Sequence, residues 1–322
     1  MELIDTAKDK VLKKNRIQPR YLFEISDLSD SEIKQLFKMA DTYAAGRSPE
    51  DELPQRQVLG SLFFQSSTRT RLGFESAAQK LGLNVVSVPS ITASRSDSVH
   101  QESIQDAVRV IQNIVDIMVV RTSEGHWYES IRDQLTIPVI NGGDGNNQHP
   151  TQALSDMWFA SRAKGDISNL RIGLVGTLGS RVHRSVIQLL CSLRPKEVGI
   201  FSEDPDIVTS IAPFKAANIP VHIYDDLTEL THNTDVVEVM PLRMPDLASE
   251  KPTAISEKSP HAILPDMFSD MDNPPLVLHP GPRSSELPDE SISCKNVPYF
   301  EQVRQAIFMK MAIYHFLLQE TK

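Results

Sequence analysis

The chain has 322 residues, of which 40% are hydrophobic and 23% charged, and its formal net charge is −9 at pH 7. These values are ordinary for a globular protein with room for two domains of about 150 residues each. The negative charge argues against a nucleic-acid partner, and no apolar run approaches the roughly 20 residues of a membrane helix. The first residues lack a signal-peptide pattern, so we expect a cytoplasmic protein without a membrane partner.

Strands and helices alternate through the first half of the chain. Residues 1–20 predict a polar tail or a short surface helix, and residues 29–32 form a capping box before a helix that ends near Gly46. The apolar run 58–64 predicts a buried strand, and the apolar spacing over 74–81 predicts a helix. The other elements expected here are strands at 85–88, 116–120 and 137–140, helices at 104–111 and 127–135, and a polar loop at 89–101. This rhythm is typical of a parallel sheet with helices on both faces.

The second half repeats the alternation. A Gly/Asn-rich loop is expected at 141–148, and Pro150 suits the first turn of the helix that follows it. The further strands expected are 171–175, 198–201, 221–224, 236–239 and 276–278, and the further helices are 182–193, 206–217 and 301–318. We therefore expect two α/β domains, each a parallel sheet flanked by helices, with the junction near residue 150. Cys191 and Cys294 have no Cys or His at ligand spacing, so neither a disulfide framework nor a zinc site is expected.

The turn after the strand 58–64 is rich in groups that bind anions. Residues 65–71 read Gln-Ser-Ser-Thr-Arg-Thr-Arg and open the next helix. Free backbone N–H groups and the positive end of a helix favour an anion, and hydroxyls and guanidiniums occupy the same few residues. The alternative is an ordinary N-cap followed by a solvated basic turn. The combination favours a phosphate site at Ser67, Thr68, Arg69 and Thr70.

Three further positions follow predicted strands or open a helix. Arg121 ends the strand 116–120, at the sheet edge where open α/β folds bind ligands, although a surface ion pair is the alternative. His149 precedes a helix, whose dipole would lower the imidazole pKa together with nearby arginines, although a capping or packing role is the alternative. Residues 279–283 read His-Pro-Gly-Pro-Arg, and their prolines leave carbonyl groups free for a ligand or merely stiffen a turn.

These motifs, in this order, resemble those of the aspartate and ornithine carbamoyltransferases. The matching segments are 67–71, 119–121, 141–156 and 279–283, and the resemblance extends over nearly the whole chain. The chain lacks the Cys-Leu-Pro and Ser-Met-Gly signatures of the ornithine enzymes, so it is most similar to the aspartate branch. The resemblance implies transfer of the carbamoyl group of carbamoyl phosphate to an amino acid. L-aspartate is the favoured acceptor, which is the reaction of pyrimidine biosynthesis, and the reaction uses no metal and no organic cofactor. The resemblance also implies that the last helix returns to the first domain, which gives domains of 1–149 plus 305–322 and of 150–304.

The resemblance assigns roles to individual residues. The residues implied in catalysis are Arg69, Thr70, Arg121, His149 and Gln152, which bind carbamoyl phosphate together with Ser67, Thr68, Pro280 and Gly281. The side-chain oxygen of Gln152 can accept from the carbamoyl NH2 group. The residues implied in acceptor binding are Arg181, Arg243, Gly281 and Pro282. Ser96 and His100 would come from a neighbouring subunit of a homotrimer, which further subunits could join.

The chain departs from the aspartate pattern at three places. His100 stands where those enzymes have a lysine, Pro245 replaces a glutamine, and residues 304–306 replace a Gly-Asn-Gly turn. Two alternatives therefore stay open: a different acceptor, such as a diamino acid, or a catalytically silent paralogue that keeps the fold. A dinucleotide-binding turn at 173–179, with Glu203 after the next strand, is a third alternative. Its G-x-x-G-x-x-G spacing lacks the glycine that lets the backbone approach the phosphates.

Overall fold

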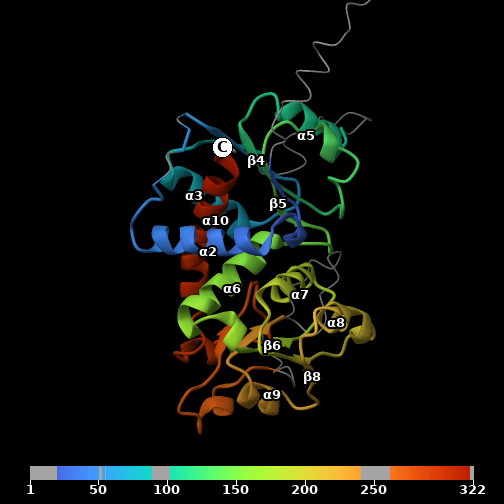
Figure 1. The fold of residues 1–322 in the computed structure, drawn as a ribbon, viewed down its shortest axis with the longest axis vertical. Helices are drawn as coiled ribbons and strands as arrows, with labels where there is room; N and C mark the ends of the chain where they lie inside the picture. Colours follow the sequence, from blue (N-terminus) through green and yellow to red (C-terminus); the bar gives the residue numbers. More distant parts are fainter. Residues whose placement is uncertain (1–19, 51–52, 55, 89–101, 241–261, 320–322) are drawn as a thin grey trace, which may run out of the picture.

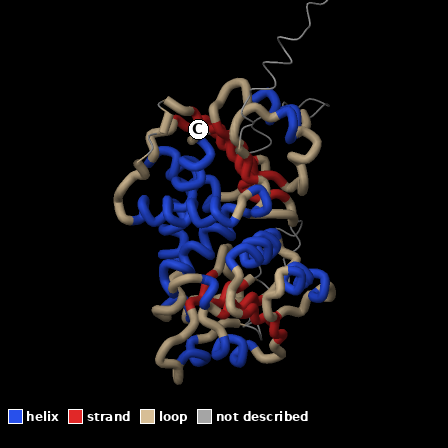
Figure 2. The backbone as a smooth tube through the Cα atoms, in the orientation of Figure 1, coloured by secondary structure: helices blue, strands red, loops and turns tan. Residues whose placement is uncertain are grey.

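The computed structural model describes residues 20–50, 53–54, 56–88, 102–240 and 262–319. Within these residues the chain forms two parallel sheets of five strands each, with helices between and around them (Figures 1 and 2). The architecture agrees with the α/β prediction. None of the helices in the described ranges is long and apolar enough to cross a membrane.

The first sheet has the strand order β1-β5-β4-β2-β3, and all its pairings are parallel. Its strands are β1 (Tyr21–Leu22), β2 (Val58–Phe63), β3 (Asn84–Val88), β4 (Ile117–Thr122) and β5 (Val139–Asp144), and the helices of this half are α2 (Asp30–Ala44), α3 (Thr68–Lys80) and α5 (Ile104–Ile111). Every residue of β4 and β5 is buried, which agrees with the apolar run that opens β4 at 117–120. Helix α2 begins at the predicted capping box, where the Ser29 side chain accepts from the Glu32 N–H.

The second sheet has the order β10-β9-β6-β7-β8 and is also parallel. Its strands are β6 (Arg171–Val175), β7 (Glu197–Phe201), β8 (Val221–Ile223), β9 (Val236–Val239) and β10 (Leu276–Leu278), and its helices are α7 (Arg181–Leu193), α8 (Ile207–Ala216) and α9 (Leu227–Asn233). The limits of β6, β9 and β10 are those predicted from the sequence. Short 3-10 helices cover Ile25–Asp27, Arg132–Gln134, Ile167–Asn169, Pro265–Phe268 and Ser291–Ser293.

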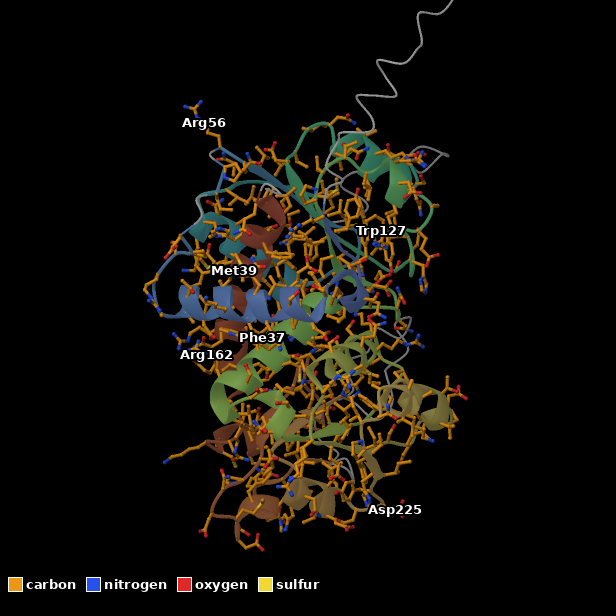
Figure 3. The ribbon with its side chains drawn as sticks, viewed as in Figure 1. Phe37, Met39, Arg56, Trp127, Arg162 and Asp225 are labelled. Atoms are coloured by element: carbon orange, nitrogen blue, oxygen red, sulfur yellow. The ribbon has the colours of Figure 1, made fainter. Side chains whose placement is uncertain are left out.

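Two long helices join the halves. Helix α6 (Pro150–Lys164) packs against α7 and β10 of the second half and against β5 of the first, while α10 (Tyr299–Leu318) packs against α2, α3 and α6. In Figure 1, α10 is the red helix that runs from the lower half into the upper half behind α2. Arg162 of α6, labelled in Figure 3, lies below the helix that carries Phe37. Its Nε is 3.5 Å from Asp41 Oδ1 of α2. The predicted docking of the last helix on a core is confirmed by its burial, and the exact domain division stays a prediction.

The helix predicted at 127–135 is wrong. This segment forms successive turns that end in a 3-10 helix, although Trp127 lies inside the upper half of the molecule in Figure 3. Trp127 and Tyr128 both contact the ring of Phe23, with centroids at 5.8 and 4.2 Å. Adjacent residues of a helix point about 100° apart, so two neighbours cannot readily cover one ring. Packing on Phe23 therefore overrides the apolar spacing that predicted a helix.

The loop predicted at 141–148 begins too early, because residues 141–144 continue β5. Asn141 pairs with Val120 of β4, and its side-chain amide donates to Phe23 O at 2.9 Å and to Asp144 Oδ1 at 2.7 Å. The Gly and Asn content therefore reflects close packing and buried hydrogen bonds in a strand. Strand β1 and helix α9, which are two and seven residues long, were absent from the sequence prediction because they carry too few residues for a periodic signal.

Candidate active site

A cavity of about 710 Å³ lies where the strands of both sheets reach their carboxyl ends. This is the edge at which open parallel sheets bind ligands. Eleven predicted site residues line it: Ser67, Thr68, Arg69, Thr70, Arg121, His149, Gln152, Arg181, Pro280, Gly281 and Pro282. The structure thus brings together motifs that are more than 200 positions apart in the sequence.

The phosphate turn opens helix α3 as predicted. Ser67 occupies the N-cap position, yet within the described residues its side chain makes no capping hydrogen bond. Its hydroxyl and the N–H groups of the first helical turn are therefore available to a ligand in the cavity. The guanidinium of Arg69 lies against Gly281, where a Cβ atom would be 2.9 Å from Arg69 Cζ. Glycine at 281, with φ +71°, lets the loop after β10 approach the phosphate turn.

Arg121 and His149 lie side by side in the cavity wall. Arg121 Nη1 donates to Gly142 O at 3.0 Å and lies 3.4 Å from His149 Nε2. The backbone N–H of His149 donates to Ser185 Oγ of α7 at 2.9 Å, which fixes the start of α6. Gly143, at φ +111°, leaves the space these two side chains need, because a Cβ atom there would be 2.8 Å from Arg121 Nη1.

The protonation of this pair follows from its burial. Burial lowers the pKa of Arg121 to about 9, and the positive charges of Arg181 and Arg69 act in the same direction. Burial also lowers the pKa of His149 well below 6.5, with further contributions from Arg121, Arg181 and Lys310. The imidazole is therefore neutral at physiological pH. The sequence predicted this direction from a helix end and arginines, but burial is the larger cause.

Gln152 lies in the first turn of α6. Its Nε2 donates to both oxygens of Asp156, each at 2.9 Å. Because a carboxylate only accepts, this contact fixes which end of the amide is nitrogen. The Gln152 side-chain oxygen is consequently free to serve as an acceptor in the cavity.

The loop after β10 has a fixed backbone. His279 Nδ1 accepts from the Gly281 N–H at 2.8 Å, so its Nε2 carries the proton and donates to Glu286 Oε1 at 2.8 Å. Both side chains are buried. Pro280 and Pro282 flank Gly281 in the cavity lining, and neither proline offers an N–H group. The loop therefore presents mainly carbonyl oxygens to a ligand.

Arg181 is the first residue of α7 and reaches the first half of the chain. Its Nη1 donates to Gln65 Oε1 at 3.1 Å and to Gly145 O at 2.9 Å. Burial lowers its pKa, and Asp144 acts in the opposite direction. The guanidinium thus lies at the cavity wall between the two sheets.

Two family models match the chain consecutively. The carbamoyl phosphate-binding domain of the aspartate/ornithine carbamoyltransferases matches residues 20–161, and their Asp/Orn-binding domain matches residues 168–317. The chain belongs to the aspartate/ornithine carbamoyltransferase family.

Individual relatives cover almost the full length. The aspartate carbamoyltransferase catalytic subunit of Picrophilus torridus is 30% identical over 312 residues, which are 96% of this chain and 99% of that protein. The aspartate transcarbamoylase of Trypanosoma cruzi, solved with aspartate and phosphate, superposes with a TM-score of 0.75 at 25% identity over 92% of this chain and 95% of that one. The ornithine carbamoyltransferase of Gloeobacter violaceus shares the fold, with a TM-score of 0.74 at 20% identity over 94% and 99% of the chains.

Several residues that the family resemblance implicated lie outside the described residues. These are Arg243 for the acceptor and Ser96 and His100 for the neighbouring subunit, together with the departure at Pro245. Their roles stay predictions. The third departure is described: residues 304–306 lie inside the continuous helix α10, where the family pattern has a Gly-Asn-Gly turn.

Sequence reasoning missed three residues around the cavity. Lys310 and Gln302 of α10 line it, and Asp156 lies behind Gln152. Lys310 is buried, its Nζ donates to Ala306 O at 3.3 Å, and it lies 5.5 Å from the centre of the Phe74 ring. Burial lowers the Lys310 pKa to about 8, while Asp156 acts in the opposite direction. The available signal was a lysine within the apolar stretch of a helix expected to be buried.

Proposed function

We propose that this chain transfers the carbamoyl group of carbamoyl phosphate to the amino group of L-aspartate, which yields N-carbamoyl-L-aspartate and phosphate. The observation that carries the proposal is the convergence, in one cavity, of the phosphate turn with Arg121, His149 and Gln152. The relatives named aspartate carbamoyltransferase support aspartate as the acceptor.

The phosphate of the substrate binds at Ser67, Thr68, Arg69 and Thr70, where hydroxyls, a guanidinium and helix N–H groups gather. The carbonyl oxygen then faces Arg121 and His149, and the carbamoyl NH2 group faces the Gln152 oxygen and the carbonyl groups of the 279–282 loop. This orientation exposes the carbonyl carbon to an amine that enters from the side of Arg181.

The neutral amine of the acceptor attacks the carbonyl carbon and forms a C–N bond. The negative charge that develops on the carbonyl oxygen is stabilised by the guanidinium of Arg121, by the imidazole N–H of His149 and by the hydroxyl of Thr70. The C–O bond to phosphate then breaks, phosphate departs, and the amine loses a proton to solvent or phosphate. Holding two reactants together in a confined cavity supplies much of the acceleration, for which effective molarities of about 10⁵ M are attainable.

The acceptor pocket is the part in which this chain departs from its relatives. Arg181, with Arg243 as its predicted partner, gives two cations for the two carboxylates of aspartate. The absence of lysine between Lys80 and Lys164 and the presence of Pro245 favour, as a second candidate, a less acidic acceptor such as a diamino acid.

We further propose a homotrimer in which the loop 92–101 of one subunit carries Ser96 and His100 to the site of its neighbour. The return of α10 to the helices of the first half supports domains of 1–149 plus 305–322 and of 150–304. If the loop crosses between subunits, mixing inactive His100→Ala and Arg69→Ala proteins restores part of the activity. A fully active monomer in light scattering would refute this arrangement.

The function is tested by measuring phosphate release from carbamoyl phosphate with aspartate and with a panel of diamino acids. Aspartate should give the highest kcat/KM; a faster diamino acid would refute the aspartate assignment, and a silent paralogue would show no rate that depends on an acceptor. In calorimetry, Arg69→Ala should abolish carbamoyl phosphate binding. Arg71→Ala is the matched control, because Arg71 is in the same helix but lies outside the cavity lining, 3.9 Å from Glu75.

A further inference from the structure

Asp156 is a buried carboxylate that contacts two amide side chains from different elements. Its oxygens accept from Gln152 Nε2 at 2.9 Å each, and its Oδ1 also accepts from Gln302 Nε2 at 2.7 Å. Asp156 and Gln152 belong to α6, whereas Gln302 belongs to α10. Asp156 itself does not line the cavity, while both amides do.

The contact determines the orientation of Gln152. An amide presents a donor at one end and an acceptor at the other, and here the donor end is held by a group that can only accept. The acceptor end is therefore the one left for the cavity. If the amide turned over, its NH2 group would face the carbamoyl NH2 group, and two donors cannot bond to each other.

Gln302 extends the connection to the loop after β10. The side-chain oxygen of Gln302 accepts from the backbone N–H of His279 at 3.1 Å, while its NH2 group donates to Asp156 Oδ1. His279 begins the loop that carries Pro280 and Gly281. One carboxylate thus orients, directly or through one amide, both protein segments that are placed to receive the carbamoyl NH2 group.

The surrounding charges keep Asp156 an acceptor. Burial raises its pKa to about 6, but the bonds from Gln152 and Gln302 and the charge of Lys310 on α10 favour the ionised form. Glu238 of β9 lies beside it, and burial together with the Asp156 charge raises the Glu238 pKa well above 4.5. Glu238 is therefore the protonated member of the pair, and Asp156 is ionised above pH 6.

We propose that Asp156 is a positioning residue that selects for the carbamoyl NH2 group by holding the Gln152 oxygen toward the cavity and, through Gln302, the backbone of His279. The proposal rests on the proposed function. It assigns to Asp156 recognition of the carbamoyl group and leaves phosphate binding to the turn at 67–70.

The experiment compares three ligands in calorimetry without an acceptor. Phosphonoacetamide carries the NH2 group in a stable form, phosphonoacetone has a methyl group in its place, and inorganic phosphate lacks both. Gln152 Nε2 contacts both oxygens of Asp156, so Asp156→Asn places an NH2 group against the Gln152 NH2 group in either orientation of the new amide. We expect phosphonoacetamide to bind about 10- to 100-fold more weakly, the cost of one mismatched buried hydrogen bond. Phosphonoacetone and phosphate should change less than about twofold.

A double variant, Gln152→Glu with Asp156→Asn, exchanges the amide and the carboxylate without altering the net charge. The new carboxylate at 152 accepts from the new amide at 156 and offers its second oxygen to the cavity. The preference for phosphonoacetamide over phosphonoacetone should return. Asp235→Asn is the matched control, because Asp235 pairs with Arg171 and lies outside the cavity lining.

Unchanged selectivity in a folded Asp156→Asn protein, equal weakening of all three ligands, or a folded double variant without selectivity overturns the proposal. If neither variant folds, Asp156 and Gln152 have a structural role, and this result also overturns the proposal. A wild-type protein that is active and selective separates these outcomes from failure of the proposed function. If the proposed function fails, the wild-type protein itself releases no phosphate and does not distinguish phosphonoacetamide from phosphonoacetone.

Discussion

Replacing Gly143 by alanine tests whether the spacing of Arg121 and His149 sets the rate. A Cβ atom at 143 would lie 2.8 Å from Arg121 Nη1, closer than Cβ atoms approach other atoms, and 3.2 Å from His149 Cδ2, which is a tight contact. The arginine is buried and bonded to Gly142 O, so it can yield only by losing that bond. A displacement approaching 1 Å in a group that stabilises a transition state costs roughly 10²-fold in rate. We therefore expect Gly143→Ala to lower kcat about 10²-fold.

The control is Gly165→Ala, because Gly165 also has a positive φ, +98°, but a Cβ atom there would have no atom of the described residues within 4 Å. Each variant should lose about 1–3 kcal/mol of unfolding free energy from backbone strain. Only Gly143→Ala should lose activity in a phosphate-release assay at saturating substrates. A Gly143→Ala enzyme with the kcat of the wild type, or an equal loss in Gly165→Ala, would refute the reasoning.

Three further predictions concern helix capping, a buried lysine and the imidazole. Ser29→Ala removes the N-cap of α2, so urea unfolding should show a loss of about 1 kcal/mol in the free energy of unfolding with kcat unchanged. An unchanged free energy of unfolding would contradict the role of Ser29 as the cap. The Lys310 pKa is lowered from 10.5 to about 8 in the folded state, so the unfolded state binds more protons between these values and stability should rise with pH across that window, by at most about 3 kcal/mol. Lys310→Met should abolish this rise when unfolding is measured at pH 8 and pH 10. The same change in unfolding free energy between these pH values in both proteins would contradict the lowered Lys310 pKa. Because the His149 pKa lies well below 6.5, His149→Ala should lower kcat about 10²-fold without altering the shape of the pH profile from 6 to 8. A wild-type profile that gains rate on acidification through pH 6.5, lost in the variant, would show instead that the imidazolium acts.

The sequence by itself determined the features whose causes are local. The capping box before α2, the proline that opens α6 and the limits of β6, β9 and β10 depend on residues within a few positions of one another, and all were predicted. The motifs at 67–71, 141–156 and 279–283 were also found, because each places several chemically specialised residues in one short segment. Parallel strands of one sheet end at a common edge, which places 67–71, Arg121 and His149 together. The loop 279–283 follows a strand of the second sheet, so its approach depends on the packing of the two halves.

Tertiary structure decided what depends on distant partners. Trp127 and Tyr128 leave the predicted helix because Phe23, more than 100 positions earlier, offers a surface for both rings. The burial that neutralises His149 and lowers the Lys310 pKa comes from elements packed around them, and no local pattern reports it. Asp156 and Gln302 are 146 positions apart, and each is unremarkable in its own helix. Only the packing of α6 against α10 joins them, because hydrogen bonds act over about 3 Å in space regardless of separation along the chain.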